Sequence, residues 1–280
     1  MSIPASTRLV FSDLDGSLLD HYSYEFQDAR PALLALERSA IPLILASSKT
    51  RAEILRVREA LGNSHPFIVE NGAAVHIPLG YFPRQPQDTE VQGEFWVHAM
   101  AQPRICWLNV LSQLESEFPA EFDSFHTAGI AGIMQMTGLS EAQAILANQR
   151  DYSEPVKWWG LPAGESRFIQ RLEGAGATVL KGGRFLSVSG NCDKGRALRW
   201  LRACYQEAAD SGPVEDLAIG DSENDRTMLE AARTALVIRS PAHGFPELAK
   251  TDRVLHSQDF GPTGWAEGVL RWLHLINLSA

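Results

Sequence analysis

A chain of 280 residues is long enough to form one large domain or two domains of ordinary size. Hydrophobic residues make up 45% and charged residues 21%, which is typical of a globular protein and excludes a disordered one. The formal charge of −9 argues against general nucleic-acid binding, because a phosphate backbone requires an excess of Lys and Arg. Since no apolar run approaches the roughly 20 residues that span a bilayer, and no signal-peptide pattern is present, we expect a cytoplasmic protein without membrane or nucleic-acid partners.

The N-terminal part of the chain alternates between strand and helix patterns. Leu9-Val10-Phe11 is a short apolar run that ends in a polar loop, as in a buried parallel strand. We expect a helix over about residues 29–38, a second buried strand over residues 41–46, and a further helix that begins at a capping box in residues 50–53. A third strand over residues 67–69 completes an alternation that predicts a parallel sheet with helices on both faces.

This pattern changes after residue 83 and returns near residue 189. The intervening stretch contains a helical apolar face, a second capping box at Ser140 and Gln143, and two strand-like runs around Gly182-Gly183, which is a hairpin-turn sequence. Helices mixed with an antiparallel hairpin predict an inserted α+β domain. We therefore expect an α/β core of residues 1–83 and 189–280 and an inserted domain of residues 84–188.

Two carboxylates follow the first predicted strand, where open α/β sheets bind their ligands. Asp13 and Asp15 lie two residues apart in an extended segment, so both carboxylates can reach the same ligand. An aspartate can attack phosphorus to give an aspartyl-phosphate, and a second carboxylate can protonate the leaving alkoxide and later deprotonate water. The alternative interpretation is an ordinary capped turn, in which Asp and Gly are also common.

Three further segments carry candidate phosphate or metal ligands. Ser47 follows the second strand at the start of a helix and could bind phosphate, although it could equally be a helix N-cap. Lys194 could neutralise charge on a phosphoryl group, whereas most lysines are simply solvated. In residues 220–225, Asp221 offers the hard oxygen ligand that Mg²⁺ prefers, and a solvated helix N-terminus is the alternative.

The order of these four segments is typical of one superfamily. With Asp-x-Asp-Gly after one strand, Ser after the next, then a Lys, and Gly-Asp-Ser-x-x-Asp after a third strand, residues 9–225 resemble the haloacid-dehalogenase-like phosphatases. The resemblance implies a Rossmann-like parallel sheet core with an inserted α+β cap domain that selects the substrate. It also implies a Mg²⁺-dependent phosphatase, because Asp15 favours phosphatase over dehalogenase chemistry.

The resemblance implies a role for each matching residue. Asp13 is the expected nucleophile and Asp15 the expected general acid and base, with Ser47 and Lys194 completing the catalytic set. Asp13, the Asp15 carbonyl and Asp221 are the expected Mg²⁺ ligands. Asp225 is expected to orient Lys194, and Asn224 to support the loop.

The sequence also resembles a narrower family, the mannosyl-3-phosphoglycerate phosphatases. The matching segments are residues 47–53, 66–75, 150–155, 182–185 and 261–265. A glycosylglycerate phosphate carries a carboxylate as well as a phosphate, and Lys49 and Arg184 are the cations expected near that carboxylate. The expected substrate-binding residues are Ser48, Lys49, Asn71 and Arg184.

This family implies hydrolysis of mannosyl-3-phosphoglycerate, or of its glucosyl analogue, with Mg²⁺ as the cofactor and a small phosphate ester as the partner. The choice of sugar stays open, because Leu186-Ser187 stands where the family tends to have a histidine. A broad-specificity sugar-phosphate phosphatase, a phosphomutase and a non-catalytic sugar-phosphate-binding protein are the alternatives. The sequence does not determine the oligomeric state.

Overall fold

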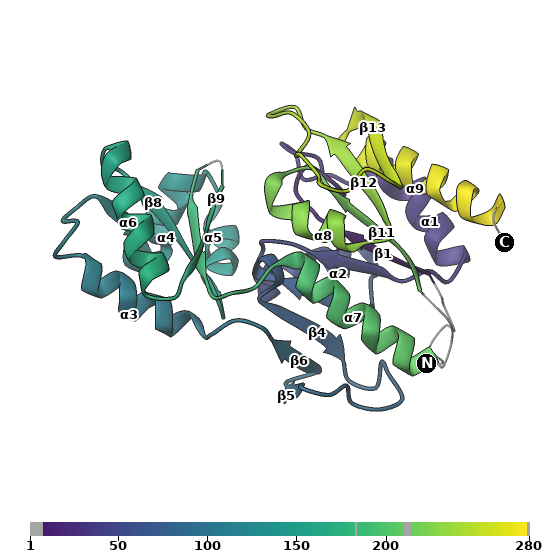
Figure 1. The fold of residues 1–280 in the computed structure, drawn as a ribbon, viewed down its shortest axis with the longest axis horizontal. Helices are drawn as coiled ribbons and strands as arrows, with labels where there is room; N and C mark the ends of the chain where they lie inside the picture. Colours follow the sequence, from purple (N-terminus) through teal and green to yellow (C-terminus); the bar gives the residue numbers. More distant parts are fainter. Residues whose placement is uncertain (1–7, 183, 210–213, 279–280) are drawn as a thin grey trace.

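The computed structural model describes residues 8–182, 184–209 and 214–278, which form two lobes (Figure 1). The larger lobe, the core, contains a nine-stranded sheet between layers of helices, and the smaller lobe, the cap, contains a four-stranded sheet with its own helices. The expected α/β fold, a parallel sheet core with an inserted α+β cap domain, is confirmed.

The core sheet has the strand order β13-β12-β11-β1-β2-β3-β4-β6-β5. The strands from β13 to β3 are parallel to their neighbours, and β4, β6 and β5 extend this sheet in antiparallel fashion at one edge. Their bounds are β1 (Arg8–Ser12), β2 (Leu43–Ala46), β3 (Phe67–Val69), β4 (Ala74–Pro78), β5 (Glu90–Gln92), β6 (Phe95–Ala99), β11 (Glu215–Gly220), β12 (Thr234–Arg239) and β13 (Val254–Phe260).

The central strands are apolar throughout because both faces of the sheet are covered. In β1, Val10 packs against the helices of one face, while Leu9 and Phe11 pack against those of the other, as the two-residue period of a strand requires. The first face is covered by α1 (Arg30–Arg38), α2 (Arg51–Leu61) and α9 (Gly261–Leu278), and the second by α7 (Lys194–Ala209) and α8 (Arg226–Ala231). Short 3₁₀ turns occur at η1 (Gln27–Ala29), η2 (Glu70–Gly72) and η3 (Glu223–Asp225).

The cap is a separate packing unit. Its antiparallel sheet has the order β7-β8-β10-β9, and its largest apolar cluster, which includes Trp107, Phe118 and Phe168, lies between this sheet and two helices. A smaller cluster around Phe125 and Ile133 lies under the other helix pair. The cap elements are α3 (Arg104–Leu114), β7 (Phe122–Ser124), α4 (Phe125–Thr137), α5 (Glu141–Asn148), β8 (Glu154–Trp158), α6 (Pro162–Gly174), β9 (Thr178–Lys181) and β10 (Leu186–Ser189).

The boundary of the cap differs from the expected range of 84–188. Residues 90–99 form β5 and β6, which pair with the core sheet rather than with the cap sheet. The polar, proline-containing sequence of residues 83–92 conceals this edge hairpin, because an edge strand gains its stability from pairing with a neighbour. We therefore propose a cap of about residues 100–188 and a core made of the remainder.

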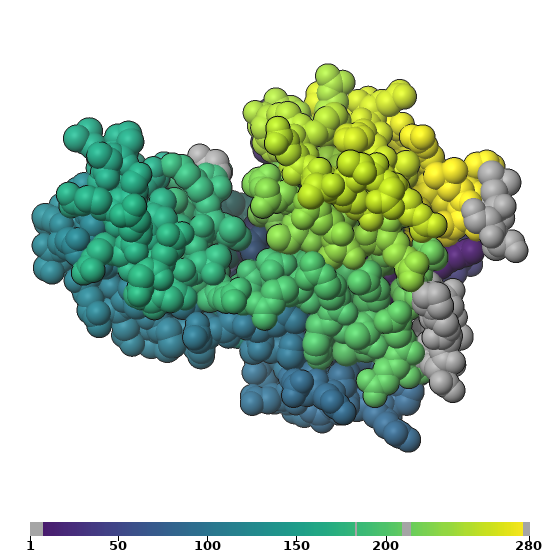
Figure 2. Space-filling view, viewed as in Figure 1, coloured from purple at the N-terminus to yellow at the C-terminus, as the bar shows by residue number. Residues whose placement is uncertain are grey.

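Two chain crossings connect the lobes, one from β6 to α3 and one from β10 to α7 (Figure 1). On the face shown in Figure 2, a notch separates the cap from the core above these crossings. None of the described helices is both long enough and apolar enough to cross a bilayer.

Candidate active site

The predicted catalytic residues gather where three adjacent parallel strands end. Because β1 lies between β11 and β2, Asp13, Ser47 and Asp221, which directly follow these strands, meet at one edge of the sheet. The backbone N–H of Asp13 donates to the Ile219 carbonyl and that of Ser47 to the Ile68 carbonyl. The strand-end ladders thus continue into the site and fix the positions of these two residues.

Lys194 is the fully buried cation of this site. Its Nζ donates to Asp13 Oδ1 and to Asp225 Oδ1, both at 2.6 Å. Although burial alone would lower the pKa of Lys194, the carboxylates of Asp13 and Asp225 raise it above its ordinary value. The lysine is therefore a permanent positive charge placed against the candidate nucleophile.

Three buried carboxylates surround this lysine. Oxygen atoms of Asp13, Asp221 and Asp225 all lie within 4.8 Å of one another. These three carboxylates are therefore close enough together to hold a metal ion. Burial, followed by the neighbouring Asp225, raises the pKa of Asp13 well above its ordinary value and that of Asp221 to about 6. The cluster has more negative than positive charge, which favours the binding of a cation.

Gly16 allows the first loop to lie against Asp221. Its φ is +79°, and a Cβ at this position would lie 2.7 Å from Asp221 Oδ2. Only glycine adopts this backbone conformation at such a close approach without strain. The Asp-x-Asp-Gly segment therefore brings Asp13 and Asp15 next to the loop that carries Asp221.

Asp15 and Lys49 form an ion pair at the entrance of the site. Lys49 Nζ lies 2.7 Å from Asp15 Oδ2 and also lies over the ring of Tyr24, 5.2 Å from its centroid. Asp15 Oδ1 is buried and has no hydrogen-bond partner among the described residues. Lys49 was expected to contact a substrate carboxylate; in the structure its ammonium pairs with the candidate general acid.

The loop after β2 holds the other expected ligands. Ser47 is buried, and its Oγ accepts a hydrogen bond from the backbone N–H of Lys49 at 3.2 Å, within the loop that precedes α2. The N-cap of α2 is Thr50, so the alternative interpretation of Ser47 as a helix N-cap is wrong. The Ser48 carbonyl accepts a hydrogen bond from Arg150 Nη2 of the cap at 2.7 Å. This loop therefore contacts both Asp15 and the cap.

Asn71 and Arg184 differ in their distance from this centre. Asn71 Oδ1 accepts a hydrogen bond of 3.2 Å from Asn224 Nδ2, which joins two expected residues from opposite sides of the site. Arg184 lies on the β9–β10 hairpin, and its guanidinium donates to the Thr137 carbonyl at the end of α4. Its described contacts lie within the cap, so the structure does not place it beside Asp13.

Sequence reasoning missed His243 and Glu70. His243 lies on the loop after β12, with Nε2 3.7 Å from Asp221 Oδ2. The strand-end rule, that open α/β sheets bind ligands where their parallel strands end, would have identified it if applied to β12. Glu70 directly follows β3 and is buried, although its carboxylate faces the cap rather than the catalytic group. Nothing in the local sequence indicates that direction.

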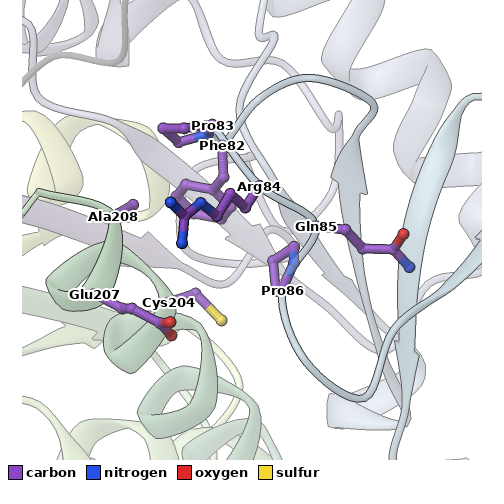
Figure 3. Close-up of a pocket in the computed structure, with 8 residues that line it drawn as sticks. All are labelled: Phe82, Pro83, Arg84, Gln85, Pro86, Cys204, Glu207 and Ala208. Carbon is purple, nitrogen blue, oxygen red and sulfur yellow. The ribbon is translucent and has the colours of Figure 1, made fainter.

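A separate cavity of about 250 Å³ lies between α7 and the loop after β4 (Figure 3). Its lining contains none of the predicted site residues and combines a few apolar side chains with two opposite charges. The lining residues are Phe82, Pro83, Arg84, Gln85, Pro86, Cys204, Glu207 and Ala208.

Comparison with known proteins agrees with this fold. Residues 10–83 match the family of haloacid dehalogenase-like hydrolases, and residues 170–273 match the sucrose-6F-phosphate phosphohydrolases. A glucosyl-3-phosphoglycerate/mannosyl-3-phosphoglycerate phosphatase from Methanococcoides burtonii is 32% identical over 263 residues, which cover 94% of this chain and 96% of that protein.

The fold and the comparisons together define a haloacid dehalogenase-like hydrolase that cleaves phosphoric monoesters. Within this superfamily, the chain belongs to the family of the glucosyl-3-phosphoglycerate/mannosyl-3-phosphoglycerate phosphatases. Both resemblances seen in the sequence are therefore confirmed.

Solved structures share the fold at much lower identity. A Thermoplasma acidophilum protein has a TM-score of 0.66 at 17% identity, over 96% of this chain and 99% of that chain. The sucrose-phosphatase of Synechocystis, solved with sucrose and phosphate, has a TM-score of 0.59 at 15% identity, over 95% and 98% of the two chains. These likenesses extend over both the core and the cap.

Proposed function

We propose that this protein is a Mg²⁺-dependent phosphatase that hydrolyses mannosyl-3-phosphoglycerate or glucosyl-3-phosphoglycerate through an aspartyl-phosphate on Asp13. The observation that carries the proposal is the buried contact of Lys194 with Asp13 and Asp225, beside Asp221. An isolated buried carboxylate would be costly, and this arrangement retains several of them around one cation.

The proposed first step is attack by an Asp13 carboxylate oxygen on phosphorus. The new O–P bond forms as the bond to the sugar-glycerate oxygen breaks. Asp15 acts in this step in its protonated form, with its ion pair to Lys49 open, and gives its proton to that leaving oxygen. Asp15 lies two residues from Asp13 and 38% of its side chain is exposed, which leaves it accessible to a leaving group at the entrance. Lys194 and Ser47 offset the charge on the phosphoryl oxygens during this transfer.

The second step is hydrolysis of the aspartyl-phosphate. Asp15, now a carboxylate, takes a proton from a water molecule as its oxygen attacks phosphorus. The bond from phosphorus to the Asp13 oxygen breaks, which releases phosphate and restores the Asp13 carboxylate. Lys194 keeps Asp13 in one orientation through both steps, because it is anchored on its other side by Asp225.

The acidic cluster fits a divalent cation. Its donors are hard carboxylate oxygens, and the raised pKa values of Asp13 and Asp221 reflect burial and repulsion that a cation would relieve. We assign Asp13, the Asp15 carbonyl and Asp221 as the ligands. When bound, Mg²⁺ would supply positive charge that offsets the phosphoryl oxygens and the carboxylates.

The substrate class follows from the relative that is similar along nearly the whole chain, which is named for both glycosyl esters. Such an ester has a phosphate for the core and a carboxylate and sugar for the entrance and the cap. The match to the sucrose-6F-phosphate phosphohydrolases over residues 170–273 favours, as a second candidate, a broader sugar-phosphate phosphatase.

Phosphate release from purified protein with Mg²⁺ distinguishes these candidates. We expect kcat/KM to be highest for the two glycosyl-3-phosphoglycerates and far lower for hexose phosphates. Equal values for hexose phosphates would favour the broader enzyme and overturn the narrow assignment. Loss of activity on removal of divalent cations, with recovery on addition of Mg²⁺, tests the cofactor.

A further inference from the structure

The carboxylate of Glu70 is fixed to the cap by backbone hydrogen bonds. Glu70 is 1% exposed and lies in the core, at the end of β3. Its two oxygens accept from the backbone N–H groups of Asp151, Tyr152 and Ser153, at 2.8, 3.2 and 2.7 Å, and from Ser153 Oγ at 2.6 Å. Several donors to one buried carboxylate make a strong, directional contact between the two lobes.

The backbone of the same residue is fixed to residues 47–50, the proposed phosphate-binding loop. The N–H of Glu70 donates to the Lys49 carbonyl, and that of Asn71 donates to the Ser47 carbonyl. The next residue, Gly72, approaches the helix that carries Lys194 so closely that a Cβ would lie 2.2 Å from the Asp193 carbonyl oxygen. The η2 turn therefore contacts the loop of Ser47 and the start of α7 at once.

This turn has a strained conformation. Glu70 and Asn71 have φ values of 47° and 60°, in the left-handed region that non-glycine residues rarely adopt. Such conformations cost about 1 kcal/mol or more each and persist only where surrounding contacts hold them. These two residues lie between the cap segment and the phosphate-binding loop. Holding them in one conformation therefore fixes how these two segments are placed relative to each other.

Neighbouring contacts join the same two segments. Arg150 Nη2 donates to the Ser48 carbonyl at 2.7 Å, and its Nε donates to Ser153 Oγ at 3.1 Å. Thr50 Oγ1 donates to the Leu146 carbonyl at 2.9 Å. The cap segment 146–153 is thus bound to the core at the phosphate-binding loop, and it also contacts Arg104, where the crossing from β6 enters the cap.

We propose that Glu70 is a positioning residue that sets the distance and orientation of the cap relative to the phosphate-binding loop. Its side chain fixes the cap, while its backbone fixes the loop that contains Ser47. The fixed distance between the phosphate-binding loop and the cap would then select esters of matching length. This role rests on the proposed function of the Ser47 loop, and it makes Glu70 a determinant of which esters fit.

The test is Glu70→Gln, which keeps the size of the side chain and removes the charge that accepts these hydrogen bonds. We expect kcat/KM for a glycosyl-3-phosphoglycerate to fall about tenfold or more, because fewer molecules would hold the cap in its aligned position over the phosphate-binding loop. For 4-nitrophenyl phosphate, which offers the cap little to bind, we expect a change below about twofold. Hydrogen exchange at the amides of residues 151–153 should become about tenfold faster or more.

Asp216→Asn is the matched control. Asp216 is equally buried, pairs with Arg202 and accepts a hydrogen bond from the Arg233 N–H, so its contacts lie within the core and away from the cap. This control variant should change kcat/KM for the two esters by the same factor. Ser153→Ala, which removes one 2.6 Å hydrogen bond, should reproduce the selective effect of Glu70→Gln at smaller size if that variant folds poorly.

Equal losses for both esters in Glu70→Gln, or unchanged exchange at residues 151–153, would overturn the role of Glu70. The exchange measurement does not depend on which ester is the natural substrate. If wild-type protein prefers another ester, the proposed substrate is wrong, and the same ratio measured with that ester still tests Glu70.

Discussion

Lys194 in the core and Lys181 in the cap lie in contrasting surroundings. Lys194 is fully buried and contacts Asp13 and Asp225, which come from distant parts of the chain. In the cap, by contrast, the side chain of Lys181 is 64% exposed and pairs with Glu165, only 16 residues away in sequence. A buried charge network permits one geometry, whereas exposed pairs are weak and can be replaced at little cost. The buried network around Lys194 thus fixes the geometry around Asp13, whereas the Lys181 pair places little constraint on the cap surface.

The largest expected effect is that of Asp13→Asn. Loss of the attacking carboxylate should reduce kcat by about 10⁴-fold or more, while binding of the ester changes little. Steady-state phosphate release and calorimetric binding measure the two quantities. Near-normal turnover would show that Asp13 is not the nucleophile.

Lys194→Met compares the two kinds of charge pair directly. Removing the buried ammonium leaves Asp13 and Asp225 without their cation, so we expect a loss of about 3 kcal/mol in the free energy of unfolding. Lys181→Met in the cap should change it by less than about 0.5 kcal/mol. Urea unfolding of both variants tests the contrast, and equal losses would contradict it.

A buried histidine in the core should make stability depend on pH. Burial lowers the pKa of His76 to about 3, and its ring stacks on Phe67 with centroids 5.0 Å apart. The unfolded chain takes up a proton below its ordinary pKa of about 6.5 and the folded chain does not, so stability is lost as pH falls from that value toward 3. At pH 5 we expect this effect to lower the free energy of unfolding by about 2 kcal/mol.

His76→Phe should remove this part of the acid sensitivity, because the ring becomes fully apolar and His76 Nδ1 makes no hydrogen bond within the part of the chain that the structure describes. Urea unfolding at pH 7 and pH 5 gives the two free energies for each protein. An unchanged difference between the two pH values in the variant would show that His76 is not responsible.

The smallest expected effect concerns the cap. If Arg184 binds the carboxylate of the substrate, Arg184→Ala should lower kcat/KM for glycosyl-3-phosphoglycerates by about tenfold and leave 4-nitrophenyl phosphate unchanged. Lys181→Ala, on the same hairpin, is the control and should leave both unchanged. No selective loss would leave Arg184 as a support for the end of α4.

The strand-end rule explains why the parallel strands and the candidate site could be predicted from the sequence. Apolar runs such as residues 217–219 identify the parallel strands, and the polar residues that follow them identify Asp13, Ser47 and Asp221. The capping box at Thr50 and the left-handed Gly62 at the end of α2 are also confirmed. These features are local, so a short stretch of sequence contains them.

Features that depend on distant partners were not predictable in the same way. Strands β4 and β6 carry His76 and His98, which interrupt the apolar pattern, and their pairing sets the cap boundary. The ion pair of Lys49 with Asp15 joins two loops, and the carboxylate of Glu70 reaches a segment 81 to 83 residues away. Side-chain direction in such cases follows from tertiary packing.

The contacts of Glu70 have a consequence for recombining domains. A cap grafted from a relative between residues 100 and 190 would join the core covalently at two places, yet its specificity would also require backbone donors equivalent to residues 151–153. Chimeras that match this internal segment to the recipient's η2 turn should inherit the donor's substrate range. Chimeras matched only at the splice points should fold and hydrolyse small esters indiscriminately.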